Sequence, residues 1–151
     1  MKGMREVKIS TKGRYALRMM LDLAQHQGDG YVALKEIAAR QGISKKYLEQ
    51  IVPMLTRGDF LLTNRGYQGG YRLARIPEKY TVGEILRLTE GSLSPVSCLE
   101  TKPNMCERAE GCITLPVWQG LEKVISEYLD GYTLDRIISE YKARRADDYV
   151  I

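Results

Sequence analysis

The chain has 151 residues, a formal net charge of +4 at pH 7, one histidine and three cysteines. This length holds one ordinary core, or a small domain with an appended helical segment, and excludes two full enzyme domains. No apolar run reaches the roughly 18–20 residues of a membrane span, and the first residues lack a secretory signal, so we expect a cytoplasmic protein. Without a phosphate loop or an acid–base pair beside a nucleophile, we do not expect an enzyme.

The charge is distributed unevenly. Residues 1–75 carry 14 Lys and Arg against 6 Asp and Glu, a net charge of +8, and the remaining residues carry a net charge of −4. A basic half attracts a polyanion such as nucleic acid through counterion release and long-range steering. The same asymmetry is also compatible with an ordinary solvated surface, so it needs support from motifs.

Three helices are predicted before residue 60. The first has Thr11 as its candidate N-cap, is apolar on nearly all sides and ends near residues 28–30. The second covers about 34–41 and stops at Gly42, because glycine adopts the positive φ of a tight turn. The third begins after Ser44, which is a favourable N-cap.

The third helix has two distinct faces. Its apolar residues recur at helical spacing and should face inward, so the polar ones are available to DNA. Pro53 lies inside the pattern, where we expect a bend, and Gly58 should end the helix. The polar set is Lys45, Lys46, Glu49 and Gln50.

A basic hairpin follows the third helix. Residues 60–63 and 71–74 are predicted strands, joined by the six residues 65–70. A polar helix start that can enter a groove, followed by a glycine-rich loop with an arginine, is the arrangement of a winged helix-turn-helix. A fourth helix over 80–89, with Thr81 as candidate N-cap, closes this domain.

The second half of the chain begins with a long loop. Residues 90–115 lack periodicity and hold all three cysteines, and loops of this length are usually functional. From Pro116 an amphipathic helix is predicted, and a second copy of the chain is its simplest partner. A last short helix over 133–141 and a polar tail over 144–148 complete the chain.

The predicted fold is therefore mainly α with a small β wing, a winged helix-turn-helix domain followed by a long C-terminal dimerisation helix. We expect a DNA-binding domain over 8–90, a cysteine-bearing sensor loop over 91–115, and the dimerisation helix with a C-terminal helix over 116–145.

Three segments carry a resemblance to a known family. They are Lys8–Leu17, Tyr47–Gln50, and Arg65–Gly66 followed by Gly69–Tyr71. In this order, and before a cysteine-bearing loop and a long helix, they resemble the BadM/Rrf-type regulators, which include the iron–sulfur regulator IscR, the nitric oxide sensor NsrR and the cysteine-metabolism regulator CymR. The resemblance implies a homodimer with crossed C-terminal helices, bound to double-stranded DNA at a palindromic promoter site.

The same resemblance assigns roles to single residues. Gln50 can pair with adenine, Glu49 can accept from cytosine N4, and Arg65 suits a narrow minor groove. Lys46 stands where the family often has a small polar residue, and Tyr47 fits packing as well as base reading. The candidate DNA contacts are Lys12, Arg14 and Tyr15 for phosphates, Ser44, Lys45, Lys46, Tyr47, Glu49 and Gln50 for the major groove, and Arg65 with Gly66 at the wing tip.

The cysteines Cys98, Cys106 and Cys112 are candidate metal ligands, because soft thiolates suit iron–sulfur clusters, zinc or copper(I). IscR and NsrR carry three cysteines in this loop, so the resemblance favours an iron–sulfur cluster, 2Fe–2S first and 4Fe–4S as the alternative. The histidine that completes the site in IscR corresponds to Leu115, and the carboxylate of NsrR-like proteins to Arg14. The fourth ligand is thus open among Glu100, Glu107, Glu110, water and a small thiol.

We expect a repressor of genes for iron–sulfur cluster assembly or cysteine metabolism. The alternative is a CymR-like regulator without a cluster, controlled by thiol redox chemistry or by a protein partner such as cysteine synthase.

Overall fold

A computed structural model describes residues 9–148 as six α-helices, one two-stranded antiparallel sheet and three short 3-10 helices. The predicted fold class is confirmed, and Lys8, the expected start of the first domain, lies outside the described residues. The elements are α1 Thr11–His26, α2 Leu34–Gln41, α3 Lys45–Arg57, β1 Leu61–Asn64, β2 Gly70–Leu73, η1 Pro77–Lys79, α4 Val82–Glu90, η2 Ser97–Leu99, η3 Ala109–Gly111, α5 Leu115–Asp130 and α6 Leu134–Asp148.

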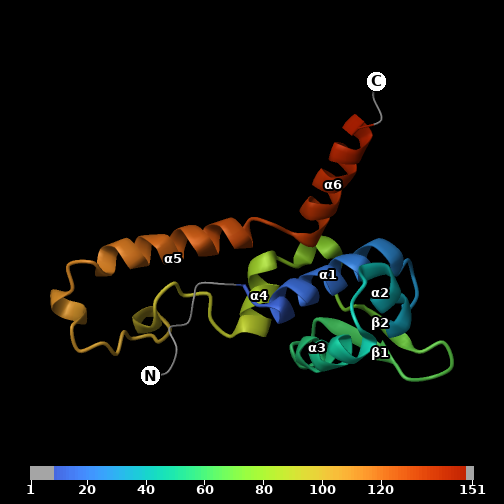
Figure 1. The fold of residues 1–151 in the computed structure, drawn as a ribbon, viewed down its shortest axis with the longest axis horizontal. Coiled ribbons are helices and arrows are strands. Elements are labelled where there is room, and N and C mark those ends of the chain that lie inside the picture. Colours follow the sequence, from blue (N-terminus) through green and yellow to red (C-terminus); the bar gives the residue numbers. More distant parts are fainter. Residues whose placement is uncertain (1–8, 149–151) are drawn as a thin grey trace.

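Helix α1 lies at the centre of the N-terminal body (Figure 1), where it packs against α2, α3, α4, α6 and β2. Removal of its apolar side chains from water provides the main driving force for this packing. The side chains that are fully buried in the shared core include Met19, Met20, Leu23, Ile37, Leu48, Ile51, Leu55, Ile85 and Leu134.

Side-chain caps fix where the helices begin. Ser44 accepts a hydrogen bond from the Tyr47 amide, and Thr81 forms a capping box with Glu84, so both predicted N-caps are confirmed. The expected cap Thr11 is wrong, because Ser10 accepts from the Gly13 amide and Thr11 is the first helical residue.

Two helices end at the glycines predicted from the sequence. Gly42 ends α2 with φ +63°, as expected, and Gly58 ends α3. A Cβ atom at Gly58 would lie 2.8 Å from a methyl group of Leu88, so α4 approaches this turn closely and a larger residue here would require Leu88 to shift. Helix α3 continues through Pro53 to Arg57.

The wing is shifted by one residue from the prediction. Leu61 pairs with Leu73 and Asn64 with Gly70, so five residues, 65–69, form the loop. Beside the hairpin, Tyr71 of β2 also forms an antiparallel bridge with Val32. A Cβ atom on Gly70 would lie 2.3 Å from the Val32 carbonyl oxygen, so only glycine permits this contact.

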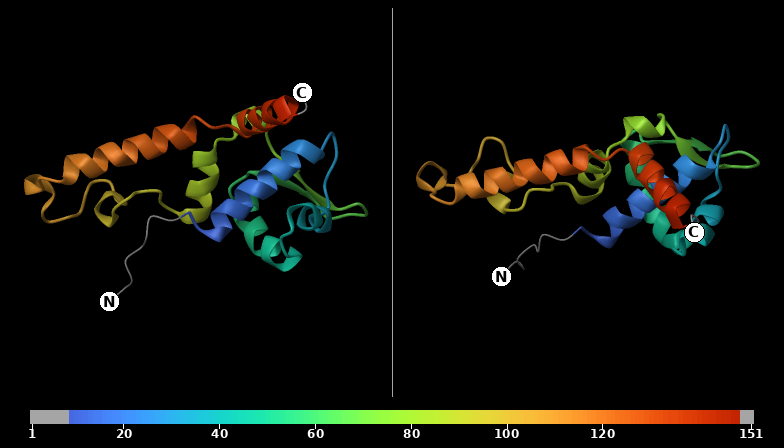
Figure 2. Two further views of the ribbon diagram at one scale, coloured as in Figure 1. Left: turned by 45° about the horizontal axis from the view of Figure 1, so that its top comes forward. Right: turned by 90° about the horizontal axis from the view of Figure 1, so that it is seen from above.

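Helix α5 extends away from the N-terminal body in all views (Figures 1 and 2), and none of its residues is buried. No helix in the described part of the chain is long and apolar enough to cross a bilayer.

The end of α5 is joined tightly to α4. The Arg87 guanidinium donates to both carboxylate oxygens of Asp130, at 2.8 and 3.0 Å. The Val82 amide donates to the Tyr132 carbonyl at 2.8 Å, and a Cβ atom on Gly83 would lie 1.9 Å from Asp130 Oδ1. Helix α4 is therefore joined to the end of α5 by a side-chain ion pair, and to the residues just after α5 by a backbone hydrogen bond.

Helix α6 is longer than predicted and begins inside the core. Leu134 is fully buried, and its amide donates to the Tyr80 carbonyl at 3.1 Å. The expected polar tail over 144–148 is wrong, since α6 continues to Asp148. Residues 142–148 contain neither glycine nor proline, so helix propensity carries the element onward.

An ion pair between a buried carboxylate and a partly exposed guanidinium connects α1 to α2. Asp22 is fully buried within α1, and its carboxylate accepts hydrogen bonds from the Arg40 guanidinium, the shortest at 2.7 Å, and from Gln41 Nε2 at 2.9 Å. The hydrogen bond to Asp22 raises the pKa of Arg40 above its ordinary value. The carboxylate avoids an uncompensated burial cost because these donors surround it.

We predict that Arg40→Ala lowers the free energy of unfolding by about 3 kcal/mol, the low end for breaking a buried pair, because Arg40 is 34% exposed and Gln41 still donates to the buried Asp22 carboxylate. Denaturant unfolding followed by circular dichroism measures this loss. Arg144→Ala, at the exposed end of α6, should leave the midpoint nearly unchanged. An equal effect of the two variants would contradict the role given to the buried pair.

Candidate nucleic-acid interface

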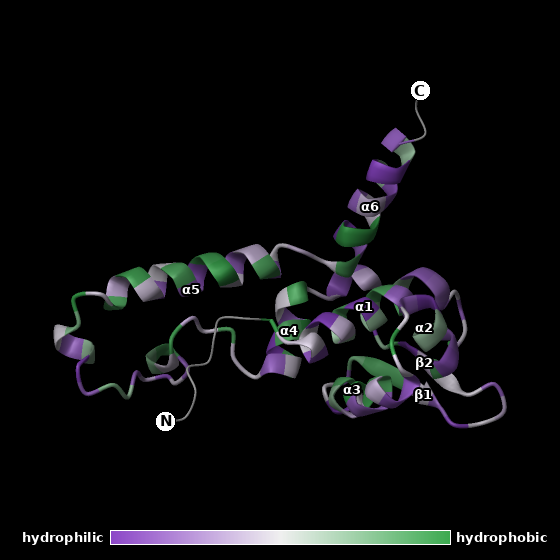
Figure 3. Ribbon diagram, in the orientation of Figure 1, coloured by the Kyte–Doolittle hydropathy of each residue, from purple (hydrophilic) through white to green (hydrophobic). Residues whose placement is uncertain are grey.

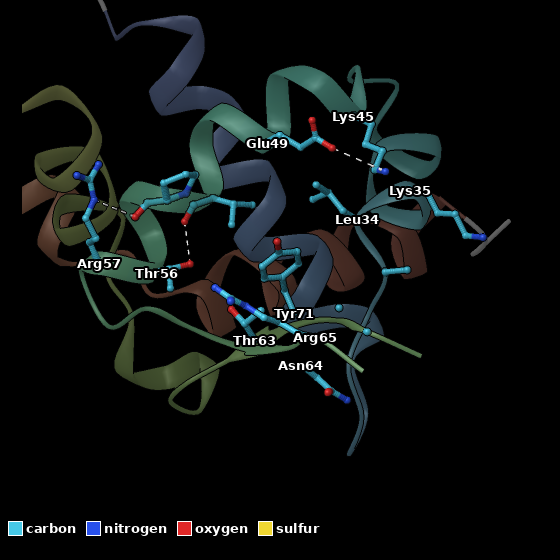
Figure 4. Close-up of a pocket in the computed structure, with 15 residues that line it drawn as sticks. Leu34, Lys35, Lys45, Glu49, Thr56, Arg57, Thr63, Asn64, Arg65 and Tyr71 are labelled. Atoms are coloured by element: carbon cyan, nitrogen blue, oxygen red, sulfur yellow. Dashed lines mark hydrogen bonds and ion pairs between the residues drawn. The ribbon is translucent and has the colours of Figure 1, made fainter. Parts of the chain in front are cut away.

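Helices α2 and α3 and the wing enclose an open groove of about 710 Å³ (Figure 4). In this view Lys35 and Arg57 lie on opposite sides, with Tyr71 and Arg65 between them. The described residues that line it are Ala33, Leu34, Lys35, Lys45, Glu49, Val52, Pro53, Thr56, Arg57, Thr63, Asn64, Arg65, Gly69, Gly70 and Tyr71.

The predicted polar face of α3 is exposed to solvent. Ser44, which caps the helix, and the four polar residues of that face all remain accessible. Lys45 and Glu49 line the groove and form an ion pair of 3.7 Å, whereas Lys46 and Gln50 do not line it. The helix therefore presents hydrogen-bond donors and acceptors on an exposed face, as contact with base edges in a DNA groove requires.

Tyr47 and Tyr15 are half-buried and contact each other. Their rings pack edge to face, with centroids 5.4 Å apart, and the Arg18 guanidinium lies 5.3 Å from the Tyr15 ring. This contact attaches the start of α3 to α1. Tyr47 thus has the packing contact that the sequence offered as one of its two roles.

The other predicted phosphate contacts lie at the start of α1. Lys12 and Arg14 are exposed and do not line the groove, and Arg14 donates to the Thr11 hydroxyl at 3.1 Å. The structure therefore places them on a separate part of the surface from the groove residues.

The wing tip has a tightly folded backbone. The Gly66 amide donates to Asn64 Oδ1 at 3.1 Å, and a Cβ atom on Gly69 would lie 2.7 Å from the Asn64 carbonyl oxygen. This turn presents Arg65 and Gly66 to solvent beside Tyr67, which is 96% exposed.

Three exposed side chains were absent from the sequence-based candidates: Lys35, Arg57 and Tyr67. For Arg57 the signal was a basic residue in the last turn of α3, and for Tyr67 an aromatic residue between Gly66 and the Gly69–Gly70 pair of the wing. Lys35 gave no comparable signal, because its place in the groove depends on how α2 packs.

The three cysteines are free thiols in the loop before α5 (Figure 1). Cys106 is exposed, and Cys98 and Cys112 are half-buried. Thiolates are the usual ligands of iron–sulfur clusters, so the donor types fit such a group. In this conformation of the loop, no three Cys, His, Asp or Glu side chains among the described residues are grouped as a metal site.

One end of this loop is held against α5. The Ser94 hydroxyl donates to Glu122 at 2.7 Å, and Leu99 beside Cys98 is buried. Cys112 Sγ lies 3.5 Å from the Thr114 hydroxyl, and this hydrogen bond lowers the pKa of the Cys112 thiol below its ordinary value. Cys98 thus lies next to the anchored part of the loop and Cys112 is hydrogen-bonded beside the start of α5, whereas Cys106 is exposed.

Comparisons with known proteins identify the family of the chain. Residues 9–140 match the Rrf2 family, described as "Iron-dependent Transcriptional regulator". The chain is 38% identical over 128 residues to the protein rrf2 of Nitratidesulfovibrio vulgaris, and the match covers 85% of each chain.

Two solved structures are similar over most of their length. The structure of CymR (YrzC), the global cysteine regulator of B. subtilis, has a TM-score of 0.72 and 39% identity, covering 88% of this chain and 97% of that one. The IscR of T. potens has a TM-score of 0.69 and 40% identity, covering 89% and 88%. The resemblance carried by the sequence motifs is confirmed, and the chain belongs to the Rrf2 family of DNA-binding transcriptional regulators.

Proposed function

We propose that the chain forms a homodimer that binds a palindromic promoter site and represses genes of iron–sulfur cluster assembly or cysteine metabolism. The observation that carries this proposal is that the polar face of α3 and the wing border one groove. Lys45 and Glu49 of α3 and Arg65 of the wing all line it. The similarity to the global cysteine regulator CymR and to IscR supports the choice of target genes.

Base reading is assigned to the exposed face of α3 in the major groove, with Arg65 and Gly66 entering the adjacent minor groove. Gln50 offers a donor and an acceptor that match the adenine edge. The Tyr15–Tyr47 contact holds the start of α3 against α1, so these side chains approach the bases from a fixed support. A fixed support favours selective binding, because fewer side chains must be ordered on contact.

For the DNA assignment, we predict that selection from a random duplex pool with the purified protein recovers an inverted repeat. Gln50→Ala should relax the preference at one base pair in each half-site by about 1–3 kcal/mol, because one bidentate contact is lost. Binding curves on the selected duplex and on single-base variants measure this. Gln25→Ala, an exposed glutamine on α1, is the matched control. Recovery of a site without internal symmetry would contradict the proposed dimeric reading.

Dimerisation is assigned to α5. Four apolar side chains on one side of this helix are strongly exposed, and Figure 3 shows hydrophobic residues recurring along it. A patch of this kind on a projecting helix is typical of a protein–protein interface, and a second α5 is a matching surface. The four are Val117 (61% exposed), Leu121 (41%), Val124 (62%) and Tyr128 (63%).

We predict that Val124→Glu converts the dimer to a monomer at micromolar concentration, since it would bury an unpaired carboxylate in the α5 contact. Light scattering coupled to gel filtration measures the mass. Gln119→Glu adds the same charge on the exposed opposite face of α5 and should leave the mass unchanged. A Val124→Glu protein that stays dimeric would exclude this face as the interface.

Signal detection is assigned to Cys98, Cys106 and Cys112, as ligands of an iron–sulfur cluster. Such a cluster, when bound, supplies a centre that is sensitive to oxidants and to iron supply. Because Ser94 and Leu99 hold the loop near Cys98, approach of the other two thiols requires the outer part of the loop to rearrange. This loop connects α4 to α5, so a change in its order can alter how the two helices are held.

We predict that anaerobically purified protein is coloured and contains iron and labile sulfide, and that Cys106→Ser loses both. Ser97→Ala, next to Cys98 in the same loop, should retain them. Visible spectra and iron and sulfide analysis provide the measurement, and affinity for the selected duplex should differ between loaded and cysteine-free protein. Colourless protein with unchanged operator binding would reject the cluster.

A cluster-free regulator is the second candidate. It is favoured by the lowered pKa of Cys112, because a larger thiolate fraction makes this side chain more open to reversible oxidation. In this case a redox change of the thiols, or a metabolic enzyme such as cysteine synthase bound to the acidic half, would control DNA binding.

A further inference from the structure

We propose that the groove between α2, α3 and the wing holds the sugar–phosphate backbone of one DNA strand, and that Lys35 and Arg57 position this strand without reading bases. This inference rests on the proposed DNA binding and adds two contacts to it. Neither residue belongs to the polar start of α3 or to the wing tip.

The charge of the groove favours a polyanion. Its lining contains Lys35, Lys45, Arg57 and Arg65 but only one carboxylate, Glu49, which already faces Lys45 at 3.7 Å. Within residues 9–148, no carboxylate lies at ion-pair distance from the other three cations. Like charges gathered around one hollow repel each other, and a phosphate chain that enters relieves this repulsion.

The lining also supplies suitable hydrogen-bond donors. Phosphate oxygens in DNA complexes accept from Arg, Lys, Thr, Asn and Tyr side chains, and all five residue types occur here. Arg57 is partly fixed in advance, because its Nε donates to the Pro53 carbonyl at 3.2 Å. The terminal nitrogens of the guanidinium therefore keep a defined direction beside the groove.

The position of the groove fits the geometry of a duplex. If α3 enters the major groove and the wing enters the adjacent minor groove, the strand that separates these two grooves has to pass between α3 and the wing. The hollow occupies this place (Figure 4), with Lys35 of α2 and Arg57 of α3 on its two sides. Gly69 and Gly70 line the hollow on the wing side.

Contacts of this kind have a characteristic signature. Each phosphate neutralised by a side chain changes the slope of log affinity against log salt by about 0.9, whatever the base sequence. Lys35→Ala and Arg57→Ala should therefore each make this slope less negative by about one, and should weaken binding to all duplexes by the same factor. A base-reading residue would instead reduce the ratio between specific and non-specific affinity.

The test measures DNA affinity of the full chain by fluorescence anisotropy at salt concentrations from about 50 to about 300 mM, a range over which such slopes are readily resolved. The probes are the duplex recovered by selection and a shuffled duplex of equal composition. Lys142→Ala and Arg144→Ala, exposed basic residues on α6, are charge-matched controls, and Arg57→Lys should recover most of the slope. Thermal unfolding by circular dichroism verifies that the variants are folded.

We expect shallower slopes for Lys35→Ala and Arg57→Ala, an unchanged ratio between the two duplexes, and wild-type slopes for the α6 controls. An unchanged slope in folded variants, or a loss of the ratio, would overturn this inference while leaving DNA binding intact. If the wild-type protein binds neither duplex in a salt-dependent way, the proposed function itself fails.

Discussion

Burial of α1 is the interaction on which the rest of the structure depends. This helix supports α2, α3, α4, α6 and the wing at once, so removal of its apolar side chains from water stabilises every element of the N-terminal body. The same helix carries Asp22, whose pairing with Arg40 fixes α2 against α1. The orientation of α3, and hence of the candidate DNA surface, follows from this arrangement.

The features that sequence predicts best are those decided within a few residues. Ser44 and Gly42 act locally, and both have their expected roles. The features it misses depend on distant contacts. Ser10 caps α1 while its own amide and hydroxyl are held by Glu90, and β2 forms a bridge with Val32, which is far from the hairpin in sequence. Lys35 likewise joins the groove only through tertiary packing.

In the cysteine-bearing loop, too, the residue types can be read from the sequence, whereas their positions in space cannot. The spacing of cysteines identifies a candidate ligand set, but spacing in a loop does not determine distance. Ser94 and Glu122 hold the first part of the loop against α5, whereas the exposed Cys106 lies on the outer part. The family is evident from residues throughout the chain, whereas convergence of the three thiols on one site depends on a conformation that the sequence does not encode locally.

The close contact of Gly83 with Asp130 has a consequence for operator choice. Since the end of α5 is bonded to the start of α4, and Glu90 at the end of α4 holds the start of α1, the direction of α5 is transmitted to the whole recognition surface. In the proposed dimer, the angle at this junction sets the separation of the two recognition helices. A regulator built in this way would distinguish promoters by the number of base pairs between half-sites as well as by their sequence.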